Sequence, residues 1–405
     1  GRCIFLPAPV ARMAPHLVLL SGEAAPVDAE AGESIGELRA RLAGALDVPV
    51  NGVKLALGGA VLSNHQAVDE LASSDVIQVV LRRVERSIYV AEAGSSRVTR
   101  WPLDGARPSA DGAASGSPAG ELVGEVVAGG RGCGCRLDQL GNPRGVFVDL
   151  KGVVYVSEGG NDRVMRWGRG AESGEVAAGG SGWGGRLEQL SNPTGVFVDS
   201  EGVIYVAEYW NHRVSRWAPG AKEGLVVAGG RGKGSDPEQL QHPDGVCVDA
   251  AGVVYVAEYG NHRVTRWAPG ATVGEVVAGG KGPGEELEHL RGPTALFVDE
   301  RGLIYVSEHL NHRVTRWTPG ASRGEAVAGG RGPGTSAEHL LYPRSIFVDV
   351  EGAVYVSEEV NHRVSRWPPG ATQGEVVAGG RGEGDRPEQL NSPFGIYVVD
   401  SGEGS

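Results

Sequence analysis

The chain has 405 residues, of which 66 are glycine and 23 are proline, and its formal net charge at pH 7 is −12. This charge argues against a general nucleic-acid binder, whose electrostatic footprint is a basic domain. Its 4 cysteines are too few and too scattered for a disulfide framework, which favours a reducing compartment. Because no run approaches the roughly 18 apolar residues of a membrane span, we expect a cytoplasmic protein without membrane contact.

Residues 1–13 are predicted to be a disordered N-terminal segment, and residues 14–84 to be a small α+β domain. Its helix starts after Ser34, with Glu37 completing a capping box. An apolar stripe runs along that helix through Ile35, Leu38, Leu42 and Leu46. Strands are expected around the helix at His16–Leu20, Ala25–Ala29, Lys54–Leu57 and Val76–Leu81.

Residues 14–83 resemble ubiquitin-like domains over their whole length. The segment DVPVNGVKLALGGAVLSNHQAVDEL, followed by SSDVIQVVLRR, matches the second half of that family segment by segment. The resemblance implies a binding patch at Ala56, Gln78 and Val80, where Ala56 replaces the family's isoleucine and Gln78 its histidine. The arginines that end this segment run on without a diglycine, so the resemblance implies a built-in module that is not conjugated. Its partners would be proteins of the ubiquitin pathway; the alternative is a solubilising cap without such a role.

A repeat of 50 residues organises the rest of the chain. It is marked by tyrosine at positions 155, 205, 255, 305 and 355 and by tryptophan at 167, 217, 267, 317 and 367, with an earlier copy at Tyr89 and Trp101. Within one copy, four short apolar runs lie between turn residues, at Gly195–Asp199, Val203–Ala207, Arg213–Trp217 and Gly224–Gly229. Four antiparallel strands in a repeat of this length predict one blade of a β-propeller.

The combination of PxGVFVD, YVxE, NHRV and a closing VVAGG resembles NHL repeats. The resemblance implies a mainly β fold, and the six copies predict a six-bladed NHL-type β-propeller over residues 87–400. Residues 103–121 are rich in Gly, Ala, Ser and Pro and are predicted to be a flexible insertion loop, and residues 401–405 are predicted to be a tail. The first copy lacks a first strand, and the last copy ends with Pro393–Asp400, a first strand without a successor. We therefore expect the C-terminal strand to close the ring, which leaves no open sheet edge.

Residues that recur in every copy are interpreted as framework. Glutamates such as Glu258 and arginines five residues later, such as Arg263, are expected to pair across each hairpin. The tryptophan should pack between blades, and histidines such as His212 should occupy turns. An active site seldom needs six equivalent copies, so no catalytic role is assigned to any of them.

Motifs for a cofactor or metal fail on inspection. GGRGKGS, residues 229–235, does not satisfy the phosphate-loop pattern, and sister repeats vary at the same place. Cys133 and Cys135 have no second ligand pair nearby in sequence, so they are expected to be ordinary thiols with no metal. No cofactor is predicted. The residue after the first proline of each inner strand shows no histidine and carboxylate cluster: Arg144, Thr194, Asp244, Thr294, Arg344 and Phe394.

Function is expected on variable loops above this scaffold. The hairpins between second and third strands and the connections between blades share one face, which we call the top face. One sector of it is predicted to be aromatic and basic and to bind a protein partner through Arg131, Arg136, Arg144, Trp183, Arg186, Tyr209, Trp210 and Tyr259. Alternatively, the Tyr209 and Trp210 rings pack onto the adjacent connection.

The sequence thus predicts a non-catalytic interaction scaffold that binds an acidic or extended peptide on its top face. RNA is the alternative ligand, since some NHL propellers read RNA there and stacked aromatics beside arginines suit it. A propeller enzyme of the peptidyl-amidoglycolate-lyase or hydrolase kind is the alternative from another class, which the resemblance to NHL proteins implies.

Overall fold

A computed structural model describes residues 16–19, 34–46, 53–57, 60–61, 76–81, 86–103 and 122–400. The chain divides between residues 85 and 86 into two compact units. The expected segments at 1–13, 25–29 and 401–405 lie outside the described residues, as does the insertion loop apart from Leu103. In the described part of the chain, no helix has the length and apolar character that crossing a membrane would require.

The smaller unit holds a four-stranded sheet and one helix. The strands β1 (His16–Leu19), β4 (Val76–Leu81), β2 (Val53–Leu57) and β3 (Ala60–Val61) are hydrogen-bonded in that order, with β1 parallel to β4. Helix α1 (Ile35–Leu46) begins at the predicted capping box, where the Ser34 N–H donates to Glu37 Oε2 at 2.8 Å. Ala56 lies opposite Gln78 in the register of β2 and β4. A ubiquitin-like identity for this unit stays a prediction.

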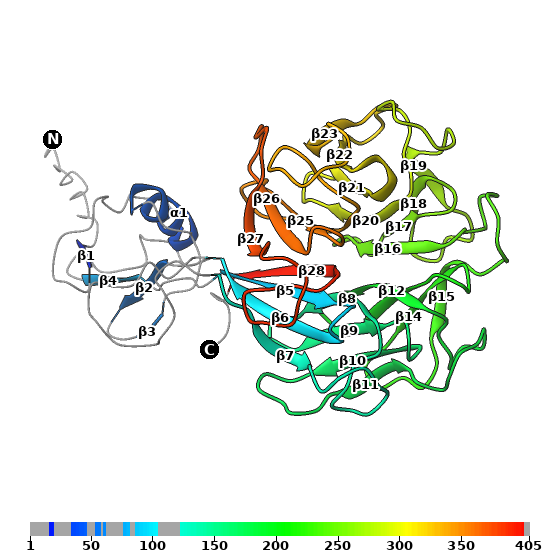
Figure 1. Ribbon diagram of the computed structural model, residues 1–405. Coiled ribbons are helices and arrows are strands. Elements are labelled where there is room, and N and C mark those ends of the chain that lie inside the picture. The colour runs from blue at the N-terminus through cyan, green and yellow to red at the C-terminus, as the bar shows by residue number, and fades with distance from the viewer. Residues whose placement is uncertain are drawn as a thin grey trace, which may run out of the picture. The chain divides into compact units, whose positions relative to one another are not determined.

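The larger unit is a six-bladed β-propeller, as predicted (Figure 1). Five of its four-stranded sheets use consecutive strands: β8 (Pro143–Val148), β9 (Val154–Glu158), β10 (Arg163–Trp167) and β11 (Glu175–Gly179); β12 (Pro193–Val198), β13 (Ile204–Glu208), β14 (Arg213–Trp217) and β15 (Leu225–Gly229); β16 (Pro243–Val248), β17 (Val254–Glu258), β18 (Arg263–Trp267) and β19 (Glu275–Gly279); β20 (Pro293–Val298), β21 (Ile304–Glu308), β22 (Arg313–Trp317) and β23 (Glu325–Gly329); β24 (Pro343–Val348), β25 (Val354–Glu358), β26 (Arg363–Trp367) and β27 (Glu375–Gly379). A single 3-10 turn, η3 (His309–Asn311), joins β21 to β22.

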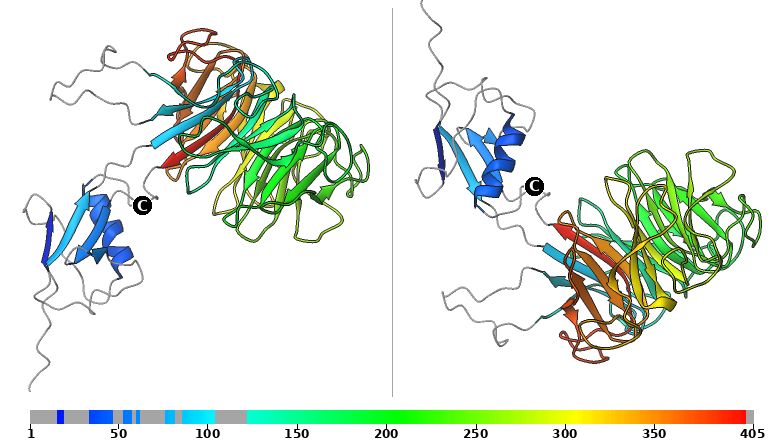
Figure 2. Two further views of the ribbon diagram at one scale, coloured as in Figure 1. Left: turned by 90° about the horizontal axis from the view of Figure 1, so that it is seen from below. Right: turned by 90° about the horizontal axis from the view of Figure 1, so that it is seen from above.

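The sixth sheet joins the two ends of the propeller. The C-terminal strand β28 (Pro393–Asp400) is the innermost strand beside β5 (Arg86–Glu92), β6 (Arg97–Pro102) and β7 (Glu125–Gly129). The red β28 lies beside the cyan β5 in both views of Figure 2. The predicted closure is therefore confirmed.

Each inner turn is fixed by an aspartate that follows the first strand. In the third blade, Asp199 Oδ1 accepts hydrogen bonds from the backbone N–H of Glu201 at 3.0 Å and of Val203 at 2.9 Å. Gly202 then takes a φ of 79°, a left-handed conformation that costs glycine little. This aspartate turn is why a first strand and a second strand of the repeat form a tight hairpin.

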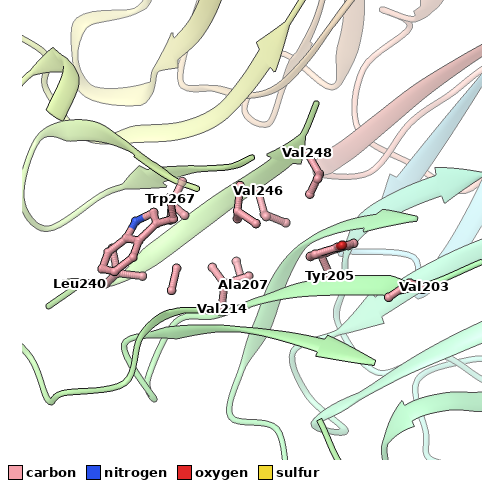
Figure 3. Packing of buried hydrophobic residues seen from close by; sticks show 11 residues of the cluster. Val203, Tyr205, Ala207, Val214, Leu240, Val246, Val248 and Trp267 are labelled. Carbon is pink, nitrogen blue, oxygen red and sulfur yellow. The ribbon is translucent and has the colours of Figure 1, made fainter. Parts of the chain in front are cut away.

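The core lies between blades, where each tryptophan packs as predicted. Trp267 of the fourth blade belongs to one cluster with Val214 and Leu240, which come from the third blade and from the connection that follows it (Figure 3). Its indole is 1% exposed. Because the same tryptophan recurs in every blade, each interface between neighbouring blades repeats this packing.

The constant glutamate and arginine form a buried ion pair in every blade, which confirms the predicted pairing across each hairpin. In the fourth blade, Arg263 Nε donates to Glu258 Oε1 at 2.7 Å, and its two outer nitrogens donate to the carbonyls of Ser235 and Gln239. Burial raises the pKa of the Glu258 carboxyl, and the Arg263 guanidinium opposes that rise. The pair ties the hairpin of a blade to the connection that enters it.

The histidine of the repeat is a turn residue, as predicted, and it also accepts a hydrogen bond. His212 has a φ of 52°, and its Nδ1 accepts from the backbone N–H of His242 at 3.1 Å. In the second blade, Asp162 replaces the histidine and accepts from the N–H of Asn192 in the same way. An unprotonated ring is therefore part of the connection between blades.

We expect His212→Asn to remove part of the acid sensitivity of the protein. Burial lowers the pKa of His212 from 6.5 to about 4. Between these two values the unfolded chain binds a proton at this residue and the folded chain does not. Stability from this group is full above about pH 6.5 and falls as the pH decreases to about 4. Asparagine tolerates the left-handed backbone and keeps an acceptor.

Urea unfolding at about pH 7.5 and about pH 4.5 measures the effect. The free energy of unfolding of the wild type should fall by about 1 kcal/mol more than that of the variant between these pH values, because solvent screens part of the cost of protonating a partly exposed ring. Equal losses in the two proteins would contradict the assignment.

Candidate functional site: the top face and the channel mouth

The strand register defines the top face. Pro193 pairs with Glu208, and Arg213 pairs with Gly229. The start of the first strand, the hairpin between the second and third strands, and the end of the fourth strand therefore lie at one end of every blade. Both the hairpin tips and the connections between blades open onto this face.

An aromatic sector, defined as Tyr209, Trp210, His242 and Tyr259, lies on the top face of the third and fourth blades. The Tyr209 ring stacks on His242 at 4.6 Å and 14°, and Trp210 meets both rings edge-on. Tyr259 follows at 6.4 Å from Tyr209. Tyr209 thus packs onto the adjacent connection, as the alternative interpretation held, whereas Trp210 remains 54% exposed.

Trp183 and Arg186 lie on the connection that enters the third blade. Asn211 Nδ2 donates to the carbonyl of Gly184 at 2.8 Å, which places this connection against the hairpin that carries Trp210. Trp183 is 71% exposed, and Arg186 is exposed with Glu188 at 3.9 Å. The structure therefore brings the two exposed tryptophans to neighbouring segments of the top face.

The remaining predicted arginines lie on the second blade and on the connection that enters it. Arg131 and Arg136 are exposed on the connection that enters the second blade, and Arg136 pairs with Asp138 at 3.2 Å. Arg144 was predicted for the same sector and is also one of the positions that follow the inner-strand proline. It lies on an inner strand and lines the mouth of the central channel, because it is the residue directly after the proline that starts β8.

At the channel mouth, two arginines flank one phenylalanine. The guanidinium carbon of Arg344 lies 4.4 Å from the centre of the Phe394 ring, and that of Arg144 lies 5.2 Å from it. Arg344 Nε donates to Glu359 Oε2 at 2.7 Å, whereas the buried Nε of Arg144 has no hydrogen-bond acceptor. The second blade has Gly159 where the sixth has Glu359, and a Cβ on Gly159 would meet Arg144 Nε at 2.8 Å.

Asp244 shares this mouth and is 6% exposed. Burial raises its pKa, and the charges of Arg344 and Arg144 oppose the rise. Burial also lowers the pKa of Arg144. Burial raises the pKa of Tyr209, and Asp244 and Arg144 act on that phenol through their charges. Tyr209 therefore links the aromatic sector to the channel mouth.

Below the mouth, the channel encloses a cavity of about 250 Å³ with a mostly apolar wall. Five aromatic rings form an arc around it through successive contacts of 4.5 to 5.3 Å: Phe197, Phe147, Tyr397, Phe347 and Phe297. Cys247 holds the equivalent position in the fourth blade and interrupts the arc. Sequence reasoning missed this arc, although an aromatic residue four positions after the inner proline was its signal.

The cysteines differ in their surroundings. Cys133 and Cys135 are exposed thiols. Cys247 is partly buried in the channel wall, and desolvation there raises its pKa to about 11, which keeps the thiol protonated. Within the described ranges, no group of three or more His, Cys, Asp or Glu side chains could hold a metal ion.

Comparisons with known proteins agree with the repeat. Residues 190–217 and 240–267 match the NHL repeat. The chain carries NHL repeats. A chain in a nidogen/laminin complex is 14% identical with a TM-score of 0.56, over 78% of this chain and 99% of that chain. This likeness of the NHL propeller to a solved structure concerns the fold alone.

Two other solved structures are similar to part of the NHL propeller. A gluconolactonase from Xanthomonas campestris is 15% identical with a TM-score of 0.43, over 58% of this chain and 74% of that chain. A streptogramin B lyase is 13% identical with a TM-score of 0.36, over 58% of this chain and 67% of that chain. None of the curated proteins matches the chain significantly.

Proposed function

We propose that the NHL propeller is a non-catalytic scaffold whose top face binds an extended peptide segment of a protein partner. The observation that carries the proposal is the pair of exposed tryptophans, Trp183 and Trp210, on neighbouring segments of one face. Exposed aromatic rings of this size are enriched at the centres of protein interfaces, where they supply much of the binding energy.

The contacts around Trp210 support a site that is formed before the partner arrives. Its indole is held edge-on against Tyr209 and His242, which limits the rotamers it can adopt. Less side-chain entropy is then lost on binding. The nidogen/laminin complex, whose chain shares the fold, is consistent with protein binding by such a propeller.

Charge favours a peptide over RNA. The exposed Arg186 lies near Glu188, and Arg136 pairs with Asp138, so each of these two predicted cations has an acidic neighbour and is not free for a phosphate backbone. The whole chain is acidic, with a formal net charge of −12. RNA binding depends on many such cations and weakens steeply with salt. Links of the N-terminal unit to the ubiquitin pathway and a cytoplasmic location stay predictions.

Capture of partners with the double variant Trp183→Ala/Trp210→Ala tests this proposal. We expect the wild type to retain a defined set of proteins after nuclease treatment, and the variant to lose most of them. Truncating a central aromatic residue typically weakens binding by 2 kcal/mol or more, which is about thirtyfold.

The matched control is Leu150→Ala/Val350→Ala. These side chains are 73% and 91% exposed, and they lie in the turns at the opposite end of the blades. The control should retain every partner. Identical partners for both double variants would sink the proposal, and capture that disappears with nuclease would assign the face to RNA.

A further inference from the structure

We propose that the central channel binds an apolar carboxylate, with the carboxylate at Arg144 in the mouth and the apolar body in the cavity below. The ligand class is a compact organic acid or the C-terminal residue of a peptide with an aromatic or large aliphatic side chain. This site uses inner-strand residues and not the exposed tryptophans, so it stands independently of the function proposed above.

The chemistry of the ligand's head group is inferred from the difference between the two arginines that flank Phe394. Arg344 has a carboxylate partner in Glu359, while the second blade offers only Gly159 at the same hairpin tip, and Arg144 Nε is buried without an acceptor. A buried donor left unpaired is costly, and a carboxylate is the acceptor that a guanidinium fork binds best. Phe394 holds the Arg144 guanidinium at 5.2 Å from its ring, which pre-orients it.

Two acidic groups share the mouth with Arg144. Glu359 is engaged by Arg344 at 2.7 Å. Asp244 makes no ion pair within 4.0 Å in the described part of the chain, and burial favours its neutral form by raising its pKa. A carboxylate at Arg144 would face some repulsion from a charged Asp244. Removing that charge should therefore strengthen the binding of an anion and weaken the binding of a cation.

The apolar body of the ligand is inferred from the gap that Cys247 leaves in the arc of aromatic rings. Phenylalanine or tyrosine occupies the equivalent position in the other five blades, and their rings contact one another in series. The smaller thiol opens the arc on one side of a cavity of about 250 Å³. An apolar cavity of about 150 Å³ already binds benzene, so this one has room for a phenyl or branched aliphatic group.

Calorimetry on the full chain tests the proposal with N-acetyl-L-phenylalanine, its uncharged amide and acetate. The acid should bind at least tenfold more tightly than the amide, which lacks the charge, and than acetate, which lacks the apolar body. Arg144→Met should lower the affinity for the acid about tenfold or more. Arg166→Met, at an exposed strand position paired with Glu175, should leave that affinity unchanged. Asp244→Asn should raise the affinity for the acid.

Two substitutions at one position test the cavity. Cys247→Phe should complete the arc and abolish binding, while Cys247→Ala keeps the gap and should retain it. A longer peptide that ends in phenylalanine with a free carboxylate identifies the source: tighter binding than the free acid assigns the site to peptide ends, and equal or weaker binding assigns it to small acids.

Three results would overturn the proposal. They are equal affinity for the acid and the amide, unchanged affinity in the Arg144→Met protein, and retained affinity in a Cys247→Phe protein that melts like the wild type.

Discussion

A chain that ends at residue 390 should lose the cooperative unfolding transition of the whole propeller. Residues 391–405 include β28, the innermost strand of the first blade, and its Ile396 and Val398 are buried in a cluster with Ile88 and Trp101. Truncating each large buried side chain typically costs 2–5 kcal/mol. Since the free energy of unfolding of a domain is only about 5–15 kcal/mol, the deletion should remove most of the stability of the propeller.

Closure also involves backbone and ring contacts that the deletion removes. The N–H of Ala93 donates to the carbonyl of Ser392 at 3.1 Å, and the Tyr397 ring contacts Phe147 at 4.5 Å and Phe347 at 5.3 Å. The loss therefore reaches the second and sixth blades. Calorimetric melting checks this, with deletion of residues 401–405 alone as the matched control. A truncated chain that melts like the intact protein would show that the ring does not depend on this strand.

Arg263→Met should destabilise the propeller by about 3–5 kcal/mol, because it leaves the carboxylate of Glu258 buried without its charge partner. Glu258 is fully buried, and the Arg263 side chain is 10% exposed. The substitution also removes the donors to the carbonyls of Ser235 and Gln239. Methionine keeps most of the aliphatic length, so the effect comes from the lost charge and hydrogen bonds.

The control for this prediction lies three residues further along the same strand. Arg266 pairs with Glu275 at 2.8 Å, but these side chains are 49% and 65% exposed. Arg266→Met should therefore cost at most about 1 kcal/mol. Denaturant unfolding of the two variants measures the contrast. Similar losses in both would mean that the buried pair is not the framework element that its repetition suggests.

The propeller could be predicted because the same pattern of strand and turn residues recurs in every copy of the repeat. The strand near Tyr205 was expected at Val203–Ala207 and lies at Ile204–Glu208, a shift of one residue that leaves the pairing with β14 intact. Closure was also predictable, because a first strand without a successor complements a first copy without a beginning. These inferences depend on order along the chain and on periodicity, which a sequence displays directly.

The channel mouth could not be predicted in the same way. Arg144, Arg344 and Phe394 were identified as equivalent positions, but sequence does not show that two of them flank the third across the ring. That arrangement depends on how the inner strands of different blades approach each other. A Cβ on Gly395, for example, would clash with the carbonyl oxygen of Arg144, so the first and second blades touch through backbone.

Residues that depart from the repeat have consequences that can be seen only in the structure. Met165 stands where other blades have Thr or Ser, and the indole N–H of Trp167 is left without an acceptor, whereas Trp217 donates to Ser215 at 3.0 Å. Likewise, Cys247 matters because of the rings beside it. A single unusual residue is ambiguous in sequence, and its meaning depends on neighbours that lie in other blades.

Hydrogen exchange of the backbone, with and without a captured partner peptide, tests the proposed top-face function most directly. We expect protection at residues 181–190 and 208–213, which carry Trp183 and Trp210, and no change in the turns at 149–152 and 199–202 at the opposite end of the blades. Protection confined to those turns, or to the unit before residue 86, would contradict the account.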